Sequence, residues 1–362
     1  MFRELKNLFD SNKMFELLKN KEAILWLKLR AISRKELLTN FVKENNFDVK
    51  SKKATDIFEE LFNTVKDSTL IDNFIRNNLK VLDAKQEQKL VSELYRIKHF
   101  DWGGDYKNAL DRYIVDRFIK KYATYDEIVN KLDNEINQAV SGYVKCSWYN
   151  HWTSILIENI FKTHKNVLPA IGEIKQVDFF VNDIPFDLKT TYLPTNFVEK
   201  ERKENGLASE ISEYKKIAKD FNISYSIQNT VYEIREKGLN SNSKDCIKRI
   251  NEIDDFKKDL LKNCIKNSQK LIQNLYEEQG EMRFDASNRL FLILVDSNDF
   301  DNSWKLKRDV DLLKRNIYCY LDNFDKRKIL NNPISFKYKF KGEEIFNAYS
   351  DCIFVVKEVK WK

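Results

Sequence analysis

The sequence predicts an α/β (α+β) protein in which a mixed β-sheet is flanked by helices, with a large helical N-terminal region and a helical insertion. Two observations lead to this prediction. Only 8 glycines and 4 prolines interrupt the 362 residues, so long helices should dominate. After residue 145, short apolar runs rich in Val, Ile and Phe alternate with charged helical stretches, as expected for strands separated by helices.

Residues 1–145 form the predicted helical N-terminal region, because apolar residues recur there every three to four positions. Four segments show this pattern: FELLKNKEAILWLKL, TDIFEELFNTVKD, QKLVSELYRI and NALDRYIVDRFIKKY. The adjacent glycines of DWGGDY (101–106) interrupt it. No GxxxxGK[ST] surrounds them, so this segment predicts a structural turn and not a phosphate-binding loop.

Residues 146–362 contain the predicted sheet. A helix at 148–164 precedes two strand-like runs, VDFFV and PFDLKTTY, and charged helices return as an insertion at about 199–280. The continuous apolar run RLFLILVD (289–296) predicts a strand buried on both faces of a parallel or mixed sheet. A helix near 303–320 and two late strands, SFKYKF and DCIFVVKEV, complete the predicted order.

The composition predicts a soluble protein of a reducing compartment, and the cytoplasm is the simplest location. Hydrophobic residues make up 42% and charged residues 33% of the chain. No uncharged apolar run reaches the ~18 residues that a membrane-spanning helix needs. The 5 cysteines form no CxxC, which argues against a disulfide framework or a zinc knuckle. The 3 histidines are scattered, which argues against a His-rich metal site.

Positive charge is concentrated near the C-terminal end of the sequence. The net charge is +7, and residues 301–362 contain 14 Lys or Arg against 9 Asp or Glu. Basic clusters at 305–308, 326–328 and 337–341 alternate with aromatic residues. Such patches suit a polyanion, because each neutralised phosphate releases counterions. A charge run can equally be a solvated face, so 301–341 and the basic helix at 200–219 are candidate DNA contacts only.

The stretch VDFFVNDIPFDLKTTY (177–192) predicts a β-hairpin with Asn182-Asp183 as its two-residue turn. Residue pairs that sum to 365 then face each other, so Asp178 would lie opposite Asp187, with Cβ atoms roughly 4.5–5.5 Å apart. Lys189 shares the face of Asp187, because side chains alternate along a strand. Phe179, Val181, Ile184, Phe186 and Leu188 all point to the opposite face, toward a core.

Two carboxylates placed directly opposite each other repel, so a sheet that keeps them needs a cation between them. All-oxygen ligation suits Mg²⁺, which binds one or two carboxylates together with waters and substrate phosphates. Lys189 beside such a metal could hold or help to deprotonate an attacking water. These are the groups that metal-assisted phosphodiester hydrolysis requires.

An acidic residue on one strand, Asp/Glu-x-Lys on the next, and a preceding helix with Glu resemble the PD-(D/E)XK nuclease superfamily. Asp178 matches the first acidic position, Asp187-Leu188-Lys189 matches the (D/E)xK, and Glu158 matches the auxiliary acid on the helix. Val177 stands where the often-absent proline of the pattern would be. The resemblance covers roughly residues 150–300.

Membership of this superfamily would imply a restriction-endonuclease-like core and Mg²⁺-dependent cleavage of double-stranded DNA. The size and the helical additions look most like a type II restriction endonuclease. By this resemblance Asp178, Asp187 and the Leu188 carbonyl would bind the metal, Glu158 would complete or orient the metal shell, and Lys189 would position the water. Cutting both strands predicts a homodimer, and a restriction enzyme needs a DNA methyltransferase of matching specificity.

Other interpretations of these residues remain open. Asp187 and Lys189 could be a surface ion pair, and Glu158 could simply pair with Lys162 one helical turn away. Glu173-Ile174-Lys175 is a second acid-x-Lys, although on one strand through 173–181 it would have the opposite parity to Asp178. Asn150-His151 could suggest an HNH-type site, but it lies in an apolar helical pattern without the further histidine that such a site needs.

Two other functions also remain open. The chain could be a non-catalytic DNA-binding or interaction protein on a nuclease-like core. It could also be a repair or transposition nuclease, which differs from a restriction enzyme in biology and not in chemistry. Neither the recognition sequence nor the residues that read bases follow from the sequence.

Overall fold

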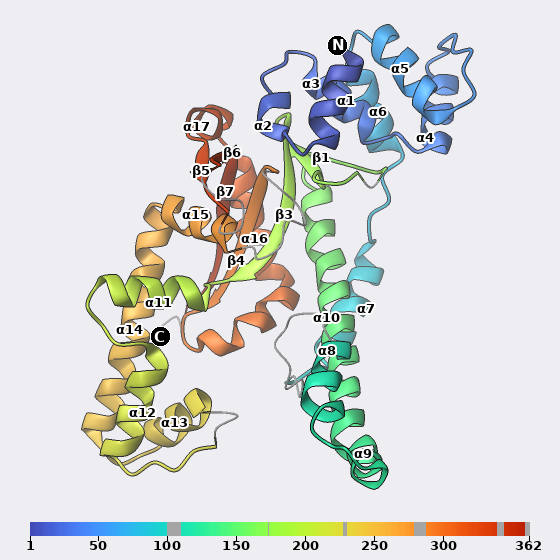
Figure 1. Ribbon diagram of the computed structural model, residues 1–362. Helices are drawn as coiled ribbons and strands as arrows, with labels where there is room; N and C mark the ends of the chain where they lie inside the picture. The colour runs from blue at the N-terminus through green and yellow to red at the C-terminus, as the bar shows by residue number, and fades with distance from the viewer. Residues whose placement is uncertain (100–109, 173, 227–229, 279–286, 339–343, 359–362) are drawn as a thin grey trace. The chain divides into compact units, whose positions relative to one another are not determined.

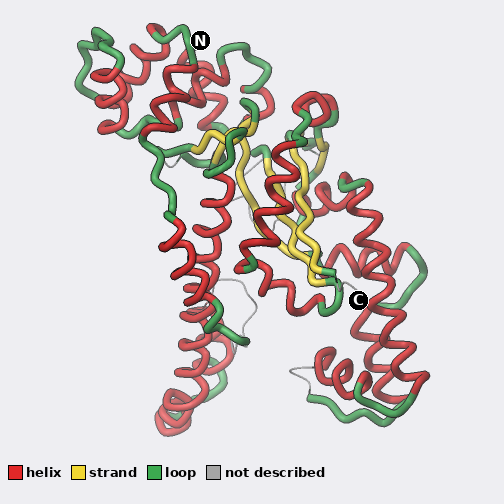
Figure 2. Tube along the Cα trace, turned by 180° about the vertical axis from the view of Figure 1, so that it is seen from behind, coloured by secondary structure: helices red, strands yellow, loops and turns green. Residues whose placement is uncertain are grey.

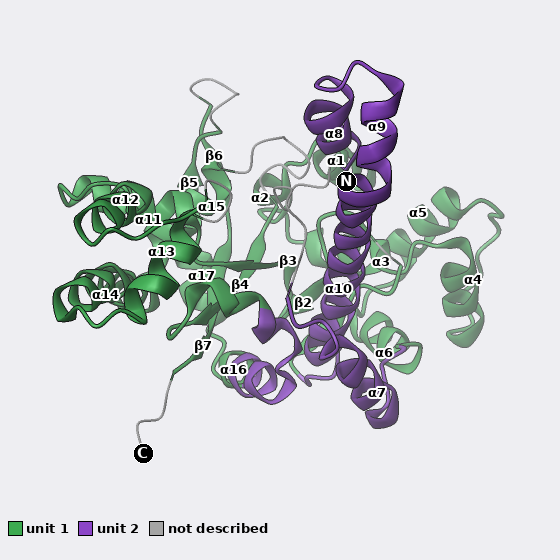
Figure 3. Ribbon diagram, turned by 90° about the horizontal axis from the view of Figure 1, so that it is seen from below, with its two compact units in different colours: residues 1–79, 166–304, 319–362 green, residues 80–165, 305–318 purple. Residues whose placement is uncertain are grey.

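The computed structural model describes the chain except for residues 100–109, 173, 227–229, 279–286, 339–343 and 359–362. Contacts divide it into two compact units. The first unit contains residues 1–79, 166–304 and 319–362, and the second contains 80–165 and 305–318 (Figure 3). None of the helices in the described ranges combines the length and hydropathy that a membrane span requires.

The first unit begins with six helices, as the apolar periodicity predicts. They are α1 (Phe2–Asp10), α2 (Met14–Leu17), α3 (Ala23–Arg30), α4 (Lys35–Glu44), α5 (Ala54–Thr64) and α6 (Thr69–Asn77). The periodic segment 15–29 is divided in the structure, because the chain turns between α2 and α3, where the Asn20 side chain accepts a hydrogen bond from Glu22 N at 2.9 Å. Trp26 and Phe58 pack at 5.3 Å within the shared core.

A mixed five-stranded sheet forms the centre of the first unit (Figures 1 and 2). Its order is β1 (Val167–Pro169), β2 (Phe179–Val181), β3 (Ile184–Tyr192), β4 (Arg289–Asp296) and β7 (Ser350–Lys357). The first three strands are antiparallel, whereas β3, β4 and β7 are parallel. The predicted mixed α/β class is therefore confirmed, and every residue of β4 is buried, as its apolar run predicts.

Three strands of the sheet region, each of three residues, are too short for the sequence pattern to reveal in full. β1 has three residues and extends the hairpin by pairing with β2. β5 (Ile334–Phe336) and β6 (Phe346–Ala348) form a separate two-stranded sheet beyond α17 (Lys326–Asn331). Of the predicted SFKYKF strand (335–340), Ser335 and Phe336 belong to β5 and residues 337–338 are not in a strand, whereas 339–340 and the turn expected near Gly342 lie outside the described residues.

The hairpin register agrees with the predicted one. The structure pairs Phe179 with Phe186, Phe180 with Pro185, and Val181 with Ile184. Asn182 and Asp183 both have positive φ, at 47° and 68°, as the two central residues of a type I′ turn must. This turn places the Phe179 and Phe186 side chains in the interior, where they are 1% and 0% exposed.

The insertion between β3 and β4 is helical, as predicted. It contains α11 (Thr195–Glu204), α12 (Glu210–Asp220), α13 (Thr230–Leu239), α14 (Lys244–Lys266) and α15 (Gln269–Glu277). The predicted basic helix at 200–219 is two helices, because the chain turns at Gly206 with φ 71°. Residues of α11, α14 and α15 pack on Phe291, Ile293 and Val295 and so cover one face of β4.

The second unit consists mainly of helices. It contains α7 (Ala84–Leu94), α8 (Leu110–Ile114), a π-helix at Val115–Ile119, α9 (Tyr125–Lys131), a π-helix at Leu132–Ile136 and the long α10 (Asn137–Lys162). Parts of a 3-10 helix (Phe300–Arg308) and of α16 (Val310–Asp322) complete it. The predicted boundary at residue 145 falls within α10, and DWGGDY lies outside the described residues.

The basic cluster at 305–308 is not a solvated patch. Arg308 is 5% exposed, and its guanidinium donates to the carbonyl oxygens of Leu94 and Ile97 at 2.7 and 2.6 Å. It also lies over the Tyr95 ring at 4.5 Å. Lys307 donates to Asn150 Oδ1 at 2.8 Å. Part of the positive charge expected to contact DNA is therefore used to attach residues 305–318 to α7 and α10.

We expect the buried lysine behind the hairpin turn to stabilise the first unit. Lys28 is 2% exposed, and its Nζ lies 2.9 Å from Asp72 Oδ2 and 2.8 Å from Asp183 Oδ1. Lys28→Ala should lower the free energy of unfolding by about 2–4 kcal/mol, because it opens a cavity and leaves both carboxylates without this partner. The exposed pair Lys6–Asp10 provides the control, since Lys6→Ala should cost under ~0.5 kcal/mol. If urea unfolding shows the same loss of stability for Lys28→Ala and Lys6→Ala, Lys28 does not stabilise the first unit in this way.

A second stability prediction concerns Lys307. Burial lowers its pKa from 10.5 to about 8, so the unfolded chain binds more protons than the folded one between these pH values. The cost of burying the charge is complete below pH 8 and is relieved as the pH rises toward 10.5. The free energy of unfolding of the wild type, relative to that of Lys307→Met, should therefore rise by on the order of 2–3 kcal/mol across that window. Urea unfolding at pH 7, 8, 9 and 10 measures the difference, and the exposed control Lys85→Met should show no such trend.

Candidate active site

Asp178 lies immediately before β2, where the pairing of β2 with β3 stops and β3 continues without it. Its backbone N–H donates to Phe186 O at 2.8 Å, and its carboxylate Oδ2 accepts from Leu188 N at 2.7 Å. The side chain thus replaces a strand partner for β3. The described ladder ends at Phe179–Phe186. The Asp178 N–H bonds to the carbonyl of Phe186, the residue that already faces Phe179. The predicted cross-strand pair of Asp178 and Asp187 therefore does not form.

Asp187 lies between two cations. Lys189 Nζ donates to its Oδ1 at 2.9 Å, which confirms that the two side chains share a face of β3. Arg289 Nε lies 3.5 Å from its Oδ2. The Asp187 side chain is 9% exposed and that of Lys189 is 34% exposed. A buried carboxylate and a more accessible ammonium therefore occupy adjacent positions on one strand face.

Arg289 is the residue of this site that the sequence analysis missed. It begins β4 directly opposite Asp187 in the parallel register, and it is 1% exposed. Its guanidinium lies over the ring of Tyr276 at 5.0 Å, and Tyr276 donates to Ser287 O at 2.8 Å. Burial raises the pKa of Tyr276, which keeps this donor protonated. The signal in the sequence was an arginine opening an otherwise apolar buried strand, because a buried guanidinium requires a nearby acid.

Asn288 connects three strands next to Arg289 and fixes the position of Asp187. The Asn288 carbonyl accepts from Asp187 N at 2.9 Å, and its side chain donates to Pro185 O at 3.2 Å. Its Oδ1 accepts from Tyr349 N at 2.9 Å, just before β7. Asn288 is 1% exposed, so these bonds are protected from water. The backbone around Asp187 is therefore held from β4 and from the start of β7.

The oxygen atoms of this region suit a hard divalent cation. Asp187 Oδ2 is buried and accepts no hydrogen bond from the described residues. The Leu188 carbonyl lies on the same edge of β3 as its N–H, which bonds to Asp178, because both groups of a strand residue point the same way. Across the described ranges no group of three or more His, Cys, Asp or Glu could hold a metal. The donor set would therefore be two carboxylates and one carbonyl, which Mg²⁺ accepts when waters and phosphates complete its shell.

Glu158, the auxiliary acid of the predicted site, belongs to the second unit. It lies on α10, and its Oε2 accepts from Lys162 Nζ at 2.9 Å. This is the helical ion pair that the sequence analysis gave as the alternative. A role for Glu158 beside Asp178 and Asp187 stays a prediction.

The competing motif Glu173-Ile174-Lys175 is only partly described, because Glu173 lies outside the described residues. Ile174 is buried at 8% exposure and Lys175 is exposed. The chain around them is not a strand, and Gln176 has φ 69°. The parity argument against this motif therefore does not apply, and only an experiment on Lys175 separates the two motifs.

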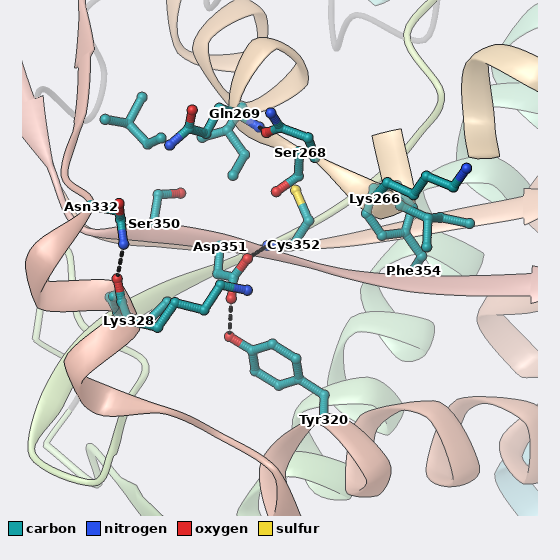
Figure 4. Close-up of a pocket in the computed structure, with 15 residues that line it drawn as sticks. Lys266, Ser268, Gln269, Tyr320, Lys328, Asn332, Ser350, Asp351, Cys352 and Phe354 are labelled. Atoms are coloured by element: carbon teal, nitrogen blue, oxygen red, sulfur yellow. Dashed lines mark hydrogen bonds between the residues drawn. The ribbon is translucent and has the colours of Figure 1, made fainter. Parts of the chain in front are cut away.

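A cavity of about 380 Å³ lies elsewhere in the first unit, beside β7 (Figure 4). Its walls come from α14, α15, α16, α17, β5 and β7, and none of the predicted site residues lines it. Tyr320 donates to Asp351 Oδ2 at 3.0 Å there, and Cys352 N donates to Asp351 Oδ1 at 2.8 Å. Burial raises the pKa of Asp351. The Asp351 carboxylate thus accepts a hydrogen bond from a backbone N–H of β7, the last strand in the sheet order.

Comparisons with protein-family models, curated proteins and solved structures found no match to this chain. The resemblance to PD-(D/E)XK nucleases therefore rests on the residues and the geometry given above.

We expect the Asp187–Arg289 pair to be energetically coupled. Arg289→Met alone should destabilise the protein by about 3–5 kcal/mol, because it leaves a buried carboxylate without this partner. Asp187→Asn should also destabilise, since it leaves the buried guanidinium without its acid. The double variant should lose less than the sum, with a coupling energy of at least ~1 kcal/mol in urea unfolding. Lys189→Met, at a position 34% exposed, serves as the control and should cost less than ~1 kcal/mol. Additive losses would show that Arg289 and Asp187 do not interact.

Proposed function

We propose that the protein is a Mg²⁺-dependent endonuclease that hydrolyses phosphodiester bonds of double-stranded DNA, most like a type II restriction enzyme. The observation that supports this best is the hydrogen bond from Leu188 N to Asp178 Oδ2. It holds Asp178 at the edge of β3, one residue from Asp187 and Lys189. A mixed sheet flanked by helices is compatible with a restriction-endonuclease-like core.

The proposed roles follow from the chemistry of each group. Asp178, Asp187 and the Leu188 carbonyl would bind Mg²⁺. When bound, Mg²⁺ supplies positive charge that stabilises the transition state of phosphodiester hydrolysis. Lys189 Nζ, 2.9 Å from Asp187 Oδ1, would donate a hydrogen bond to the attacking water and orient it toward the phosphorus. Asn288 would keep Asp187 in position through the backbone bond at 2.9 Å.

Cleavage of both strands requires two such sites, so the proposal includes a homodimer that acts on a symmetric target. A restriction enzyme would also require a DNA methyltransferase of matching specificity in the same system. This partner follows from the biology of restriction and implies no contact with the chain.

A second candidate function has its own supporting observation. Arg289, only 3.5 Å from Asp187 Oδ2, supplies a positive charge that could compensate the buried acid without any metal. On this basis the chain would be a non-catalytic DNA-binding protein with a nuclease-like core. DNA cleavage distinguishes this candidate from the first.

The test is incubation of the purified protein with plasmid DNA and Mg²⁺. We expect discrete fragments that disappear with EDTA, and a loss of about 10²–10⁴-fold in rate for both Asp187→Ala and Lys189→Ala. The matched control is Lys175→Ala in the competing acid-x-Lys motif, which should cut at the wild-type rate.

Three other results would change the assignment. Loss of cleavage in Lys175→Ala but not in Lys189→Ala would transfer the site to the competing motif. DNA binding without cleavage of any DNA would leave the non-catalytic candidate. Cleavage at DNA structures instead of sequences, read from the fragment ends, would favour a repair or transposition nuclease.

A further inference from the structure

The longest helix of the described chain has a solvent-exposed stripe of unusual composition. On α10 the exposed side chains recur at helical spacing through Ser141, Val144, Lys145, Trp148 and Trp152. Val144 is 56% exposed, and each of the two tryptophans is 36% exposed. Large exposed aromatic side chains gathered along one helix face mark a binding surface more often than a solvated one.

This stripe has no negative charge. Residues 136–157 include no aspartate or glutamate, although these two types make up 56 of the 362 residues. The exposed polar side chains are instead hydrogen-bonding or basic, namely Asn137, Gln138, Ser141, Lys145 and His151. A solvated helix in so charged a protein would normally alternate both signs of charge. The absence of acids is what a surface that approaches phosphates requires.

The opposite face of α10 holds the stripe rigidly within the second unit. Tyr149 and Thr153 are fully buried there, and the Tyr149 ring lies 5.9 Å from the Arg308 guanidinium. Asn150 accepts from Lys307 at 2.8 Å, and Asn159 accepts from Leu82 N at 2.8 Å. His151 and Trp152 pack edge to face at 5.3 Å. These contacts fix the rotation of the helix, so the same residues always face outward.

We propose that this acid-free face of α10 (Asn137, Gln138, Ser141, Val144, Lys145, Trp148, His151 and Trp152) is a DNA-contacting surface. Lys145 would neutralise a phosphate, and Trp148 and Trp152 would pack against sugars or bases. Helix α10 has 26 residues and is therefore about 39 Å long, enough to follow a duplex for roughly one turn. The inference rests on the proposed function, because it assigns a contact surface to the substrate of that reaction.

A protein partner is the alternative occupant, because tryptophans are also common in protein interfaces. Charge distinguishes the two. A protein interface tolerates carboxylates at its polar rim, whereas the phosphates of a polyanion repel carboxylates that lie beside them. The exposed amide and hydroxyl groups of Asn137, Gln138 and Ser141 extend the stripe with donors and acceptors suited to phosphates and base edges.

Fluorescence anisotropy with a labelled mixed-sequence duplex tests the proposal, with Ca²⁺ in place of Mg²⁺ to prevent cleavage. Trp148→Ala and Trp152→Ala should each weaken binding by about 5- to 100-fold. Lys145→Gln should reduce the slope of log Kd against log salt by about 1. All three side chains are exposed, so circular dichroism should show unchanged folding. The matched control is Lys85→Gln, an exposed lysine on α7 of the same unit, which should change neither quantity.

Each result decides a separate question. Wild-type binding and cleavage with unchanged affinity in all three α10 variants would overturn this inference and leave the proposed function standing. Equal effects of Lys145→Gln and Lys85→Gln on the affinity and its salt dependence would also overturn it, because the affinity would then depend on the overall charge and not on the α10 face. A change in sedimentation from dimer to monomer without loss of DNA affinity would identify a protein contact instead. A wild type that neither binds nor cuts DNA would refute the proposed function, and this inference with it.

Discussion

The two-residue turn at Asn182-Asp183 is the constraint on which the candidate site depends. Both residues have positive φ, which the asparagine and aspartate side chains tolerate better than most. A slip of one residue would send every side chain of β3 to the opposite face, taking Asp187 and Lys189 away from their present partners. Lys28 holds the turn from α3 by pairing with Asp183. Although burial opposes it, Lys28 lowers the pKa of Asp183 and keeps that carboxylate charged. The N-terminal helices therefore help to fix the register of a strand more than 150 residues later in the sequence.

The site arises because β3 is longer than β2. β3 has nine residues and β2 has three, so beyond Phe186 the strand needs other partners. The Asp178 carboxylate supplies one on the β2 side, and β4 supplies the ladder on the other. Where β4 begins, it brings Arg289 against Asp187. A difference in strand length thus places two acids and two cations within a few residues of each other.

Contacts between residues that are close in the sequence, such as those of the hairpin, could be predicted. Contacts between residues far apart in the sequence could not. The hairpin follows from alternation and from a turn dipeptide, which lie within one stretch of sixteen residues. The pairing of Asp187 with Arg289 depends on the parallel register of two strands separated by five helices, and no local pattern sets that register. The burial of Arg308 could not be predicted for the same reason, because it depends on the Leu94 and Ile97 carbonyls about two hundred residues earlier. The roles of Glu158 and of the other site residues remain predictions.

The two proposals involve different units of the chain, and this makes them physically separable. The candidate site is built from the hairpin, β4 and Asn288 of the first unit, whereas the α10 face depends on Lys307, Arg308 and Asn159 of the second. Removing an exposed lysine or tryptophan from α10 alters the attraction to a polyanion but leaves the surroundings of Asp187 intact. Removing the Asp187 carboxylate alters a buried ion pair and the proposed metal shell but leaves the charge of α10 unchanged. Binding and chemistry should therefore respond to different substitutions, as expected if the substrate is held by one surface and cut at another.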